Sequence, residues 1–357
     1  MSVQLRLISC FFVVLFANSQ EIKSRLIPDQ IRQTVINRVN EGIYPGVVIG
    51  MIDSSQSEFF CYGYKSVAGK DMVDEQTIFE IGSVTKTFTG VLFAEMILRG
   101  EVKANDRLQD YLPARAHAPS YNRKHIRLIN LVNHSSSLPH NPTNWPSPYT
   151  GTYKTDLLYD FLNGYQLDHP IGSRYEYSNL GIGLLGHVLA LKLKTDFEHL
   201  LIERILDPLK MNSTRITLTD SMYSHLARGY DQNLKEVANL ELIALDAAGG
   251  LRSSAADLLH YLAANMGLEQ SNLYQAMQLS HEITFAASDS QKIGMGWQRF
   301  ISPNTDIVWH NGNTLGYSCY LGFTADKQRG VVILCNSENR IDDIGKRLLQ
   351  ANLNFEE

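Results

Sequence analysis

Three short motifs contain residue types that could carry out nucleophilic acyl-transfer chemistry. The first is Ser83-Val84-Thr85-Lys86, at the start of an apolar run that predicts a helix over 84–99. Residues three apart share a helix face, so the Ser83 hydroxyl and the Lys86 amine can meet there. A serine hydroxyl needs an adjacent base, and a lysine can be that base where burial lowers its pKa. Ser-x-x-Lys arises by chance about once in a chain of this length, so this motif alone decides little.

The second motif is Tyr177-Ser178-Asn179, between a Pro-Ile-Gly turn and an apolar stretch that predicts a helix over 180–191. A tyrosine hydroxyl in a loop before a helix can point into a cleft and relay a proton to a leaving group. The competing interpretation is a buried tyrosine with an ordinary hydrogen bond, which is the common case.

The third motif, His310-Asn311-Gly312, follows a strand predicted over 306–309. A cation or donor at His310 could hold a substrate carboxylate, and Gly312 lets the backbone come close to a ligand. The next N–H, that of Asn313, is placed to complete an oxyanion hole with the N–H of Ser83. The competing interpretation is a strand-end histidine followed by a turn glycine.

Hydrophobic patterns indicate which elements must position these motifs. Strand-like runs lie at both ends of the chain, and helical spacing dominates its middle. The expected strands are 47–52, 58–64, 294–301, 306–309, 316–324 and 331–336, and the expected helices include 28–40, 84–99 and 342–353. We therefore expect an α/β chain of the α+β type, with one antiparallel sheet and flanking terminal helices. This α/β lobe would comprise about residues 20–75 and 286–357, beside a mostly helical lobe of about 76–285, with the site in the cleft between them.

Taken together and in this order, the motifs resemble those of the serine β-lactamase and D-alanyl-D-alanine carboxypeptidase superfamily, in its class C-like branch. The matches are Ser83 and Lys86 to S-x-x-K, Tyr177 and Asn179 to Y-x-N, and His310 and Gly312 to the H-x-G form of the third motif. Supporting segments include 79–86, 126–139 and 248–257, and the resemblance covers about residues 25–353.

The resemblance implies a role for each motif residue. Ser83 would be acylated, with Lys86 and Tyr177 sharing the general-base and general-acid roles. Asn179 would position Lys86 and the substrate amide. The remaining substrate-binding residues would be His310, Gly312 and Asn313. The mechanism implies no metal and no cofactor.

The third motif departs from the K-T-G of class C β-lactamases. A histidine is only partly charged at neutral pH unless a substrate carboxylate stabilises its cation. This favours a D-alanyl-D-alanine carboxypeptidase or endopeptidase acting on peptidoglycan peptides over a class C-type β-lactamase. An esterase or a non-catalytic relative on the same fold are further alternatives. The loop 139–153, with Asn144, Trp145 and Tyr149, resembles the site-flanking loop of such carboxypeptidases, and Ser137 stands where a glycine is usual.

Composition excludes several other classes. The chain has 357 residues, is 44% hydrophobic and carries a net charge of -5, which is typical of a globular protein. It has no long basic run, so we expect no nucleic-acid partner. It also lacks the G-x-S-x-G elbow of α/β-hydrolases, an H-E-x-x-H zinc motif and a glycine-rich phosphate loop.

The first residues predict export. Arg6 precedes an apolar stretch over 7–16 and a small-x-small pattern that ends at Ser19. This is typical of a secretory signal peptide at 1–19, followed by an exported domain at 20–357, periplasmic or extracellular. The stretch is too short to span a bilayer, and we expect no membrane span in the mature chain.

Three cysteines follow the predicted signal peptide, and two of them, Cys319 and Cys335, lie in neighbouring strand-like runs. A disulfide between them could form in an oxidising compartment. The favoured interpretation is that both are small buried hydrophobic residues.

Overall fold

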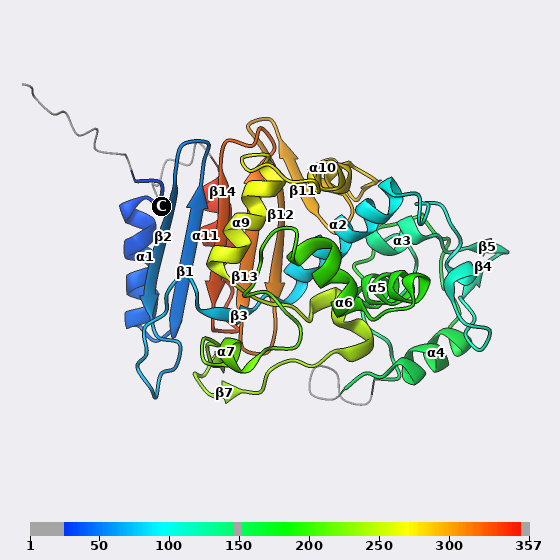
Figure 1. The fold of residues 1–357 in the computed structure, drawn as a ribbon, viewed down its shortest axis with the longest axis horizontal. Helices are drawn as coiled ribbons and strands as arrows, with labels where there is room; N and C mark the ends of the chain where they lie inside the picture. The colour runs from blue at the N-terminus through cyan, green and yellow to red at the C-terminus, as the bar shows by residue number, and fades with distance from the viewer. Residues whose placement is uncertain (1–24, 146–151, 351–357) are drawn as a thin grey trace, which may run out of the picture.

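The computed structural model describes residues 25–145 and 152–350. Its centre is an eight-stranded sheet in the order β2-β1-β14-β13-β12-β11-β10-β9, with every neighbouring pair antiparallel (Figure 1). The strands are β1 (Gly46–Ile52), β2 (Ser57–Gly63), β9 (Phe285–Ala286), β10 (Gln291–Ile293), β11 (Gln298–Ser302), β12 (Thr305–Asn313), β13 (Ser318–Thr324) and β14 (Gly330–Cys335). The predicted antiparallel sheet, built from both ends of the chain, is confirmed.

Two strand predictions need correction. The strand predicted over 294–301 begins only at Gln298, as β11, because residues 294–297 form the connection from β10, where Gly296 has a left-handed φ of 72°. An added Cβ at Gly296 would lie 2.0 Å from the Lys86 carbonyl oxygen, so the chain turns at a glycine that must touch α2 (Thr85–Leu98). The strand predicted over 306–309 extends further as β12, and it therefore contains the third motif instead of ending before it.

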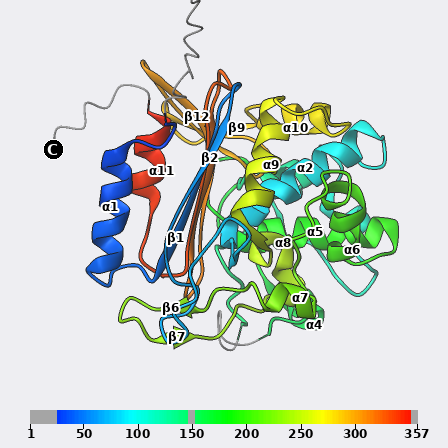
Figure 2. The same cartoon turned by 60° about the vertical axis from the view of Figure 1, so that its left-hand side comes forward.

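Helices cover both faces of the sheet, as the edge-on view in Figure 2 shows. On one face α1 (Asp29–Asn40) and α11 (Asp342–Leu349) pack against alternate side chains of β1 and β14. Ile31 and Val35 of α1 and Ile344 of α11 are fully buried in this layer. Because each buried aliphatic side chain contributes roughly 1.5–3 kcal/mol, this small core fixes the two terminal helices on the sheet.

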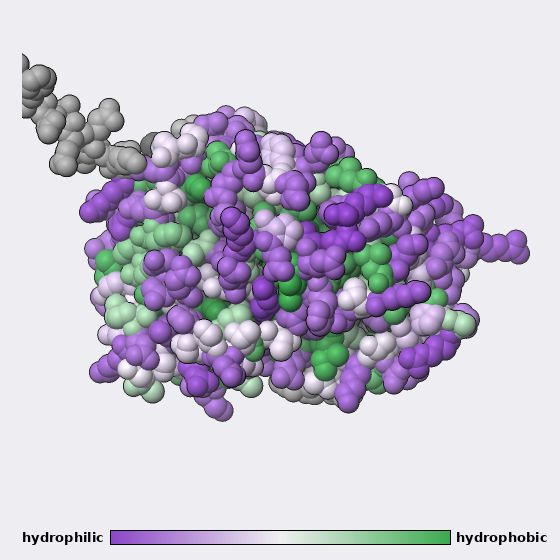
Figure 3. Space-filling view, in the orientation of Figure 1, coloured by the Kyte–Doolittle hydropathy of each residue, from purple (hydrophilic) through white to green (hydrophobic). Residues whose placement is uncertain are grey.

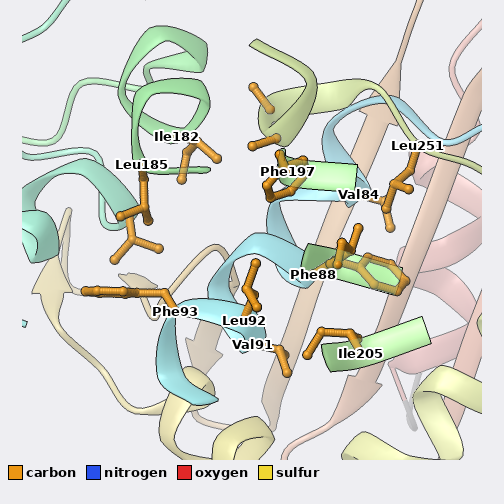
Figure 4. Close-up of a cluster of buried hydrophobic side chains, with 14 of the residues drawn as sticks. Val84, Phe88, Val91, Leu92, Phe93, Ile182, Leu185, Phe197, Ile205 and Leu251 are labelled. Atoms are coloured by element: carbon orange, nitrogen blue, oxygen red, sulfur yellow. The ribbon is translucent and has the colours of Figure 1, made fainter. Parts of the chain in front are cut away.

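The larger core lies on the other face, and α2 runs through it. Almost every residue of α2 is buried, including Phe88, Val91 and Leu92, and Figure 4 draws these side chains in one buried cluster with Ile182 and Leu185 of α5. The other helices of eight or more residues on this side are α4 (Thr155–Gly164), α5 (Asn179–Leu193), α9 (Ala255–Met266) and α10 (Tyr274–His281). A helix buried all round is held rigidly, and this helix carries the first motif.

The middle of the chain also contains short elements that the helical pattern did not predict. They are the strands β3 (Ile78–Glu80), β4 (Ser120–Tyr121), β5 (Lys124–His125), β6 (Gly229–Tyr230), β7 (Glu236–Val237) and β8 (Arg252–Ser254), and the short helices α3 (Leu128–Val132), α6 (Phe197–Leu201), α7 (Asp220–Tyr223) and α8 (Asp246–Gly249). Within the described ranges no helix is both long and apolar enough to cross a membrane. The division into two lobes stays a prediction, and the predicted signal peptide lies outside the described residues.

The two cysteines of the strand-like runs do not pair. Cys319 and Cys335 are both buried and free. Side chains alternate between the faces of a sheet, and Cys319 joins the large core whereas Cys335 joins the core under α1 and α11. A disulfide cannot form across the sheet, so the interpretation of buried hydrophobic residues is confirmed.

Candidate active site

The first motif lies where the chain enters α2. Ser83 sits in a 3-10 turn (Gly82–Val84), and α2 begins at Thr85, so the serine precedes the α-helix that the sequence placed it on. The tighter turn still brings Lys86 Nζ to 2.9 Å from Ser83 Oγ. Ser83 is only half-buried, whereas Lys86 is fully buried. The nucleophile is therefore accessible while its partner is shielded from water.

The environment of Lys86 suits it to act as a base. Its Nζ lies 2.7 Å from Asn179 Oδ1 and 2.6 Å from the Ala248 carbonyl oxygen. Burial lowers the pKa of the Lys86 amine well below its usual range. A neutral amine has two N–H donors and one lone pair, and both of these oxygens only accept. In the neutral form the two N–H groups go to Asn179 and Ala248, which turns the lone pair toward the Ser83 hydroxyl.

The second motif brings Tyr177 to the other side of Lys86. Lys86 Nζ lies 5.0 Å from the centroid of the Tyr177 ring. The next residue, Ser178, caps α5 by accepting a hydrogen bond from the Gly181 N–H at 2.9 Å, which fixes the chain at this point. The His134 ring stacks on Tyr177 at 4.5 Å, and His134 Nδ1 accepts the Ser178 N–H at 3.0 Å. The tyrosine is held by its own helix cap and by a second, buried histidine.

The third motif faces the nucleophile because of the alternation along β12. His310 and Gly312 point to the α2 side, whereas Asn311 points to the opposite face and donates to Asp342 Oδ1 at 2.7 Å. An added Cβ at Gly312 would lie 2.0 Å from the carbonyl oxygen of Ile81, just before the nucleophile turn. Only a glycine allows this approach.

The backbone N–H groups of Ser83 and Asn313, predicted to form an oxyanion hole, belong to segments that touch each other. Thr314 N–H donates to the Tyr317 carbonyl at 3.0 Å, and pairing alternates along an antiparallel ladder, so the Asn313 N–H faces away from β13. Asn313 N would lie 3.0 Å from a Cβ built on Gly82, the residue before Ser83. Two N–H donors on touching segments can stabilise one developing oxyanion.

His310 is neutral, which differs from the expected cation or donor for a carboxylate. Its Nδ1 donates to the Asn311 carbonyl at 2.6 Å, so no N–H remains for substrate. Burial, with Lys86 nearby, lowers the pKa of His310 to about 3. Its Nε2 is buried and has no hydrogen-bond partner among the residues that the structure describes. With Nδ1 donating, Nε2 carries a lone pair and can only accept a hydrogen bond.

Asn179 is also more occupied than its expected substrate role requires. Its Oδ1 accepts from Lys86, and its Nδ2 lies 3.2 Å from His140 Nε2 and 3.0 Å from Asn141 Oδ1. Both N–H groups of the amide are therefore taken in this structure. A substrate amide must displace one of these two acceptors to reach Asn179.

The cleft above Ser83 is narrow, with a cavity volume of about 30 Å³. The described lining consists of apolar residues, amide-bearing residues and the serine, without a charged side chain: Gly82, Ser83, Asn141, Trp145, Asn179, Leu240, Leu242, Leu245, Ala248, Gly249 and Asn313. Of the loop residues expected beside the site, Tyr149 lies outside the described residues.

Several residues of this site were not assigned a role by the sequence. His134, His140 and Asn141 belong to the matched segment around 126–139 or follow it directly, but only the fold brings them to Tyr177 and Asn179. The Ala248 carbonyl is a backbone group, for which a sequence carries no signal. Ser137 has a φ of 65°, the left-handed conformation that the usual glycine adopts more easily.

Comparison with known proteins identifies the family of the chain. The family model described as Beta-lactamase matches residues 31–353. The chain belongs to the β-lactamase family. Among curated members, the β-lactamase of Pseudomonas fluorescens is 29% identical over 82% of this chain and 88% of its own. The β-lactamase of Escherichia coli (strain K12) is 28% identical over 92% of this chain and 93% of its own.

Solved structures of the family share the fold. A β-lactamase/D-alanine carboxypeptidase from Pseudomonas syringae superposes with a TM-score of 0.81 at 24% identity, covering 91% of this chain and 99% of that one. A class C β-lactamase superposes with a TM-score of 0.81 at 22% identity, covering 92% of this chain and 97% of that one. The predicted resemblance and the class C-like fold are confirmed.

Proposed function

We propose that this β-lactamase-family protein is a serine hydrolase that reacts with penicillins and forms an acyl-enzyme at Ser83. The observation that carries the proposal is the fully buried Lys86 amine, 2.9 Å from Ser83 Oγ and held by two acceptor oxygens. A base placed this way can activate a hydroxyl that is otherwise a poor nucleophile.

The reaction follows from these positions. Ser83 Oγ attacks the substrate carbonyl carbon as its proton passes to Lys86 Nζ, and the N–H groups of Ser83 and Asn313 hold the oxyanion. Collapse of the tetrahedral intermediate breaks the C–N bond, and the proton reaches the leaving nitrogen through Tyr177. Water then attacks the ester carbonyl and gives up a proton to the same base, which returns it to Ser83 Oγ as the ester C–O bond breaks and the carboxylic acid leaves.

The finer proposal is a D-alanyl-D-alanine carboxypeptidase or endopeptidase acting on peptidoglycan peptides. The H-x-G motif supports it, and so does the likeness to a structure named β-lactamase/D-alanine carboxypeptidase. Such a substrate carries a carboxylate, and charging His310 at pH 7 from a pKa of about 3 costs of order 5 kcal/mol. The attraction between the charged His310 and a carboxylate about 4 Å away contributes roughly 4 kcal/mol at an effective dielectric constant near 20. The two terms nearly cancel, so we expect weak carboxylate binding that improves as the pH falls.

Two other activities have supporting observations. Hydrolysis of β-lactams is supported by the curated relatives named β-lactamase. Hydrolysis of simple esters is supported by two features that require no carboxylate on the substrate: the neutral His310, and the absence of a charged side chain among the described residues that line the cleft.

We also propose that the protein is exported, since the pattern at 1–19 is typical of a signal peptide. N-terminal sequencing of the secreted chain would test this, with a start near residue 20 expected.

Fluorescent penicillin tests the function directly. Purified protein without residues 1–19 is mixed with the drug, and the covalent label is followed over time on a denaturing gel, with Ser83→Ala as the matched control. A label on the wild type alone that persists for many minutes supports the peptidase. A label that vanishes as the drug is consumed supports the β-lactamase. No label, together with turnover of p-nitrophenyl esters that depends on Ser83, would replace both with the esterase.

A further inference from the structure

A basic cavity lies at the end of the molecule formed by β4 and β5, opposite the end that carries α1 (Figure 1). Its volume is about 450 Å³. Four cationic side chains line it, together with one histidine, one amide and one aliphatic residue: Arg107, Arg123, Lys124, Arg127, His125, Asn130 and Ile171. Hydrophilic side chains dominate this end of the surface in Figure 3. We refer to it as the basic cavity.

The charge of the basic cavity is not neutralised by the protein. All four cationic residues are exposed, and none of them forms a salt bridge within residues 25–145 and 152–350. The chain as a whole has a net charge of -5, yet residues 111–155 contain no Asp or Glu. The neighbouring Asp106 carboxylate is turned away, because it accepts the Tyr111 hydroxyl at 2.5 Å and the Lys103 N–H at 2.8 Å. No carboxylate of the described residues therefore balances this cluster.

Two backbone features place like charges together at some cost in stability. Arg107 and Arg127 are paired in an antiparallel bridge, and like charges opposite each other destabilise such a pair. Asn122 and Arg123 form the two-residue turn between β4 and β5 with φ values of 47° and 66°. Turns of this kind favour glycine at the second position. Arg123 therefore lines the cavity from a strained backbone position, and strained backbone positions are common at binding sites.

We propose that the basic cavity, lined by Arg107, Arg123, Lys124 and Arg127, binds a phosphate-bearing anion such as a phosphomonoester or diphosphate. Guanidinium groups present paired N–H donors whose spacing matches two phosphate oxygens, and three of the four cations are arginines. Arg127 commits one N–H to the Asn105 carbonyl, which fixes the side chain and leaves its other donors for a ligand. The phosphate is either that of a free compound or that of a lipid headgroup, and the chemistry is the same. This site is independent of the proposed hydrolase activity.

Calorimetric titration of the full mature chain with inorganic pyrophosphate tests the proposal, with succinate at equal ionic strength as the comparison anion. The variant is Arg123→Ala with Lys124→Ala, and the matched control is Lys65→Ala with Lys235→Ala, which removes the same charge elsewhere. We expect pyrophosphate to bind the wild type and the control pair, and the cavity variant to bind at least about tenfold more weakly, because each charged hydrogen bond is worth about 1.5–3 kcal/mol. A second arm measures co-sedimentation with phosphatidylglycerol vesicles and with phosphatidylcholine vesicles.

The outcomes separate the ligand sources and the hypotheses. Binding of pyrophosphate supports a free phosphate compound, and binding only to phosphatidylglycerol vesicles supports a headgroup. Three results would overturn the proposal. The wild type could bind succinate as tightly as pyrophosphate, or the control pair could lose as much affinity for pyrophosphate as the cavity variant. The third result is that neither pyrophosphate nor the vesicles bind. Penicillin labelling of the cavity variant is expected to match that of the wild type, so failure of the hydrolase proposal would leave this test unaffected.

Discussion

Replacing Gly312 by alanine should separate the nucleophile turn from the strand that completes the oxyanion hole. The new Cβ would lie 2.0 Å from the Ile81 carbonyl oxygen and 3.0 Å from Ser83 N. Carbon and oxygen atoms in close contact are about 3.3–3.6 Å apart. One of the two segments must therefore move by roughly 1 Å or more, since the Ile81 oxygen belongs to the backbone and cannot rotate away.

This displacement has a predictable size in both activity and stability. Loss of one oxyanion donor lowers the rate by about 10²–10³, so we expect penicillin acylation of Gly312→Ala to slow by about that factor. Overpacking costs about 1–3 kcal/mol. Each kcal/mol lowers Tm by about 2–4 °C in a domain of this size class, so Tm should fall by several degrees without loss of the fold.

A matched glycine distinguishes the local effect from general destabilisation. Gly322 lies on β13, and a Cβ there would lie 2.8 Å from Trp309 Cβ, away from the nucleophile. Gly322→Ala should therefore lower Tm in thermal melts while its acylation rate stays near that of the wild type. Wild-type acylation by Gly312→Ala would refute the assignment of the oxyanion hole to these two segments.

Three further predictions concern protons. Lys86→Met keeps the length of the side chain and removes the base, so acylation should fall by about 10²–10⁴ in the penicillin assay. His140→Gln keeps an acceptor for Asn179 but cannot titrate. Burial lowers the pKa of His140 below its usual 6.5, so the wild-type acylation rate should fall as His140 becomes protonated below that pH. The pH profile of His140→Gln should lack this fall. Burial also lowers the pKa of His281 to about 3. The unfolded chain therefore takes up this proton first as the pH falls from about 6.5 to 3, and the free energy of unfolding should fall by up to about 1.4 kcal/mol per pH unit. Melts of His281→Gln should show a shallower acid slope.

Each of these predictions has a contradicting result. Undiminished labelling of Lys86→Met would mean that another group takes the proton from Ser83. An identical acid limb in His140→Gln would show that the histidine does not control Asn179. Equal acid slopes for His281→Gln and the wild type would show that this histidine is solvated or charged in the folded state.

Motif order predicted the site because catalytic residue types are local and rare in combination. Ser83 and Lys86 meet across one helical turn, and Tyr177 directly precedes the residue that caps α5. The relative positions of the residues within each motif therefore depend on local structure alone. The strand patterns at the two ends of the chain predicted the sheet for a similar reason, since alternation is a local property. The late start of β11 was missed because the turn before it depends on the contact of Gly296 with Lys86, which is remote in sequence.

The amino-acid sequence by itself determined the family and the antiparallel sheet, and it predicted the serine, lysine and tyrosine of the candidate site. These depend on short-range spacing and on residue identity. Only the tertiary structure decided the charge states and the remaining partners. Lys86 and His310 have lowered pKa values because the assembled core removes water from them, and burial cannot be read from a motif. The basic cavity likewise exists only because the chain brings Arg107 beside Arg127, and its charge is a property of that arrangement.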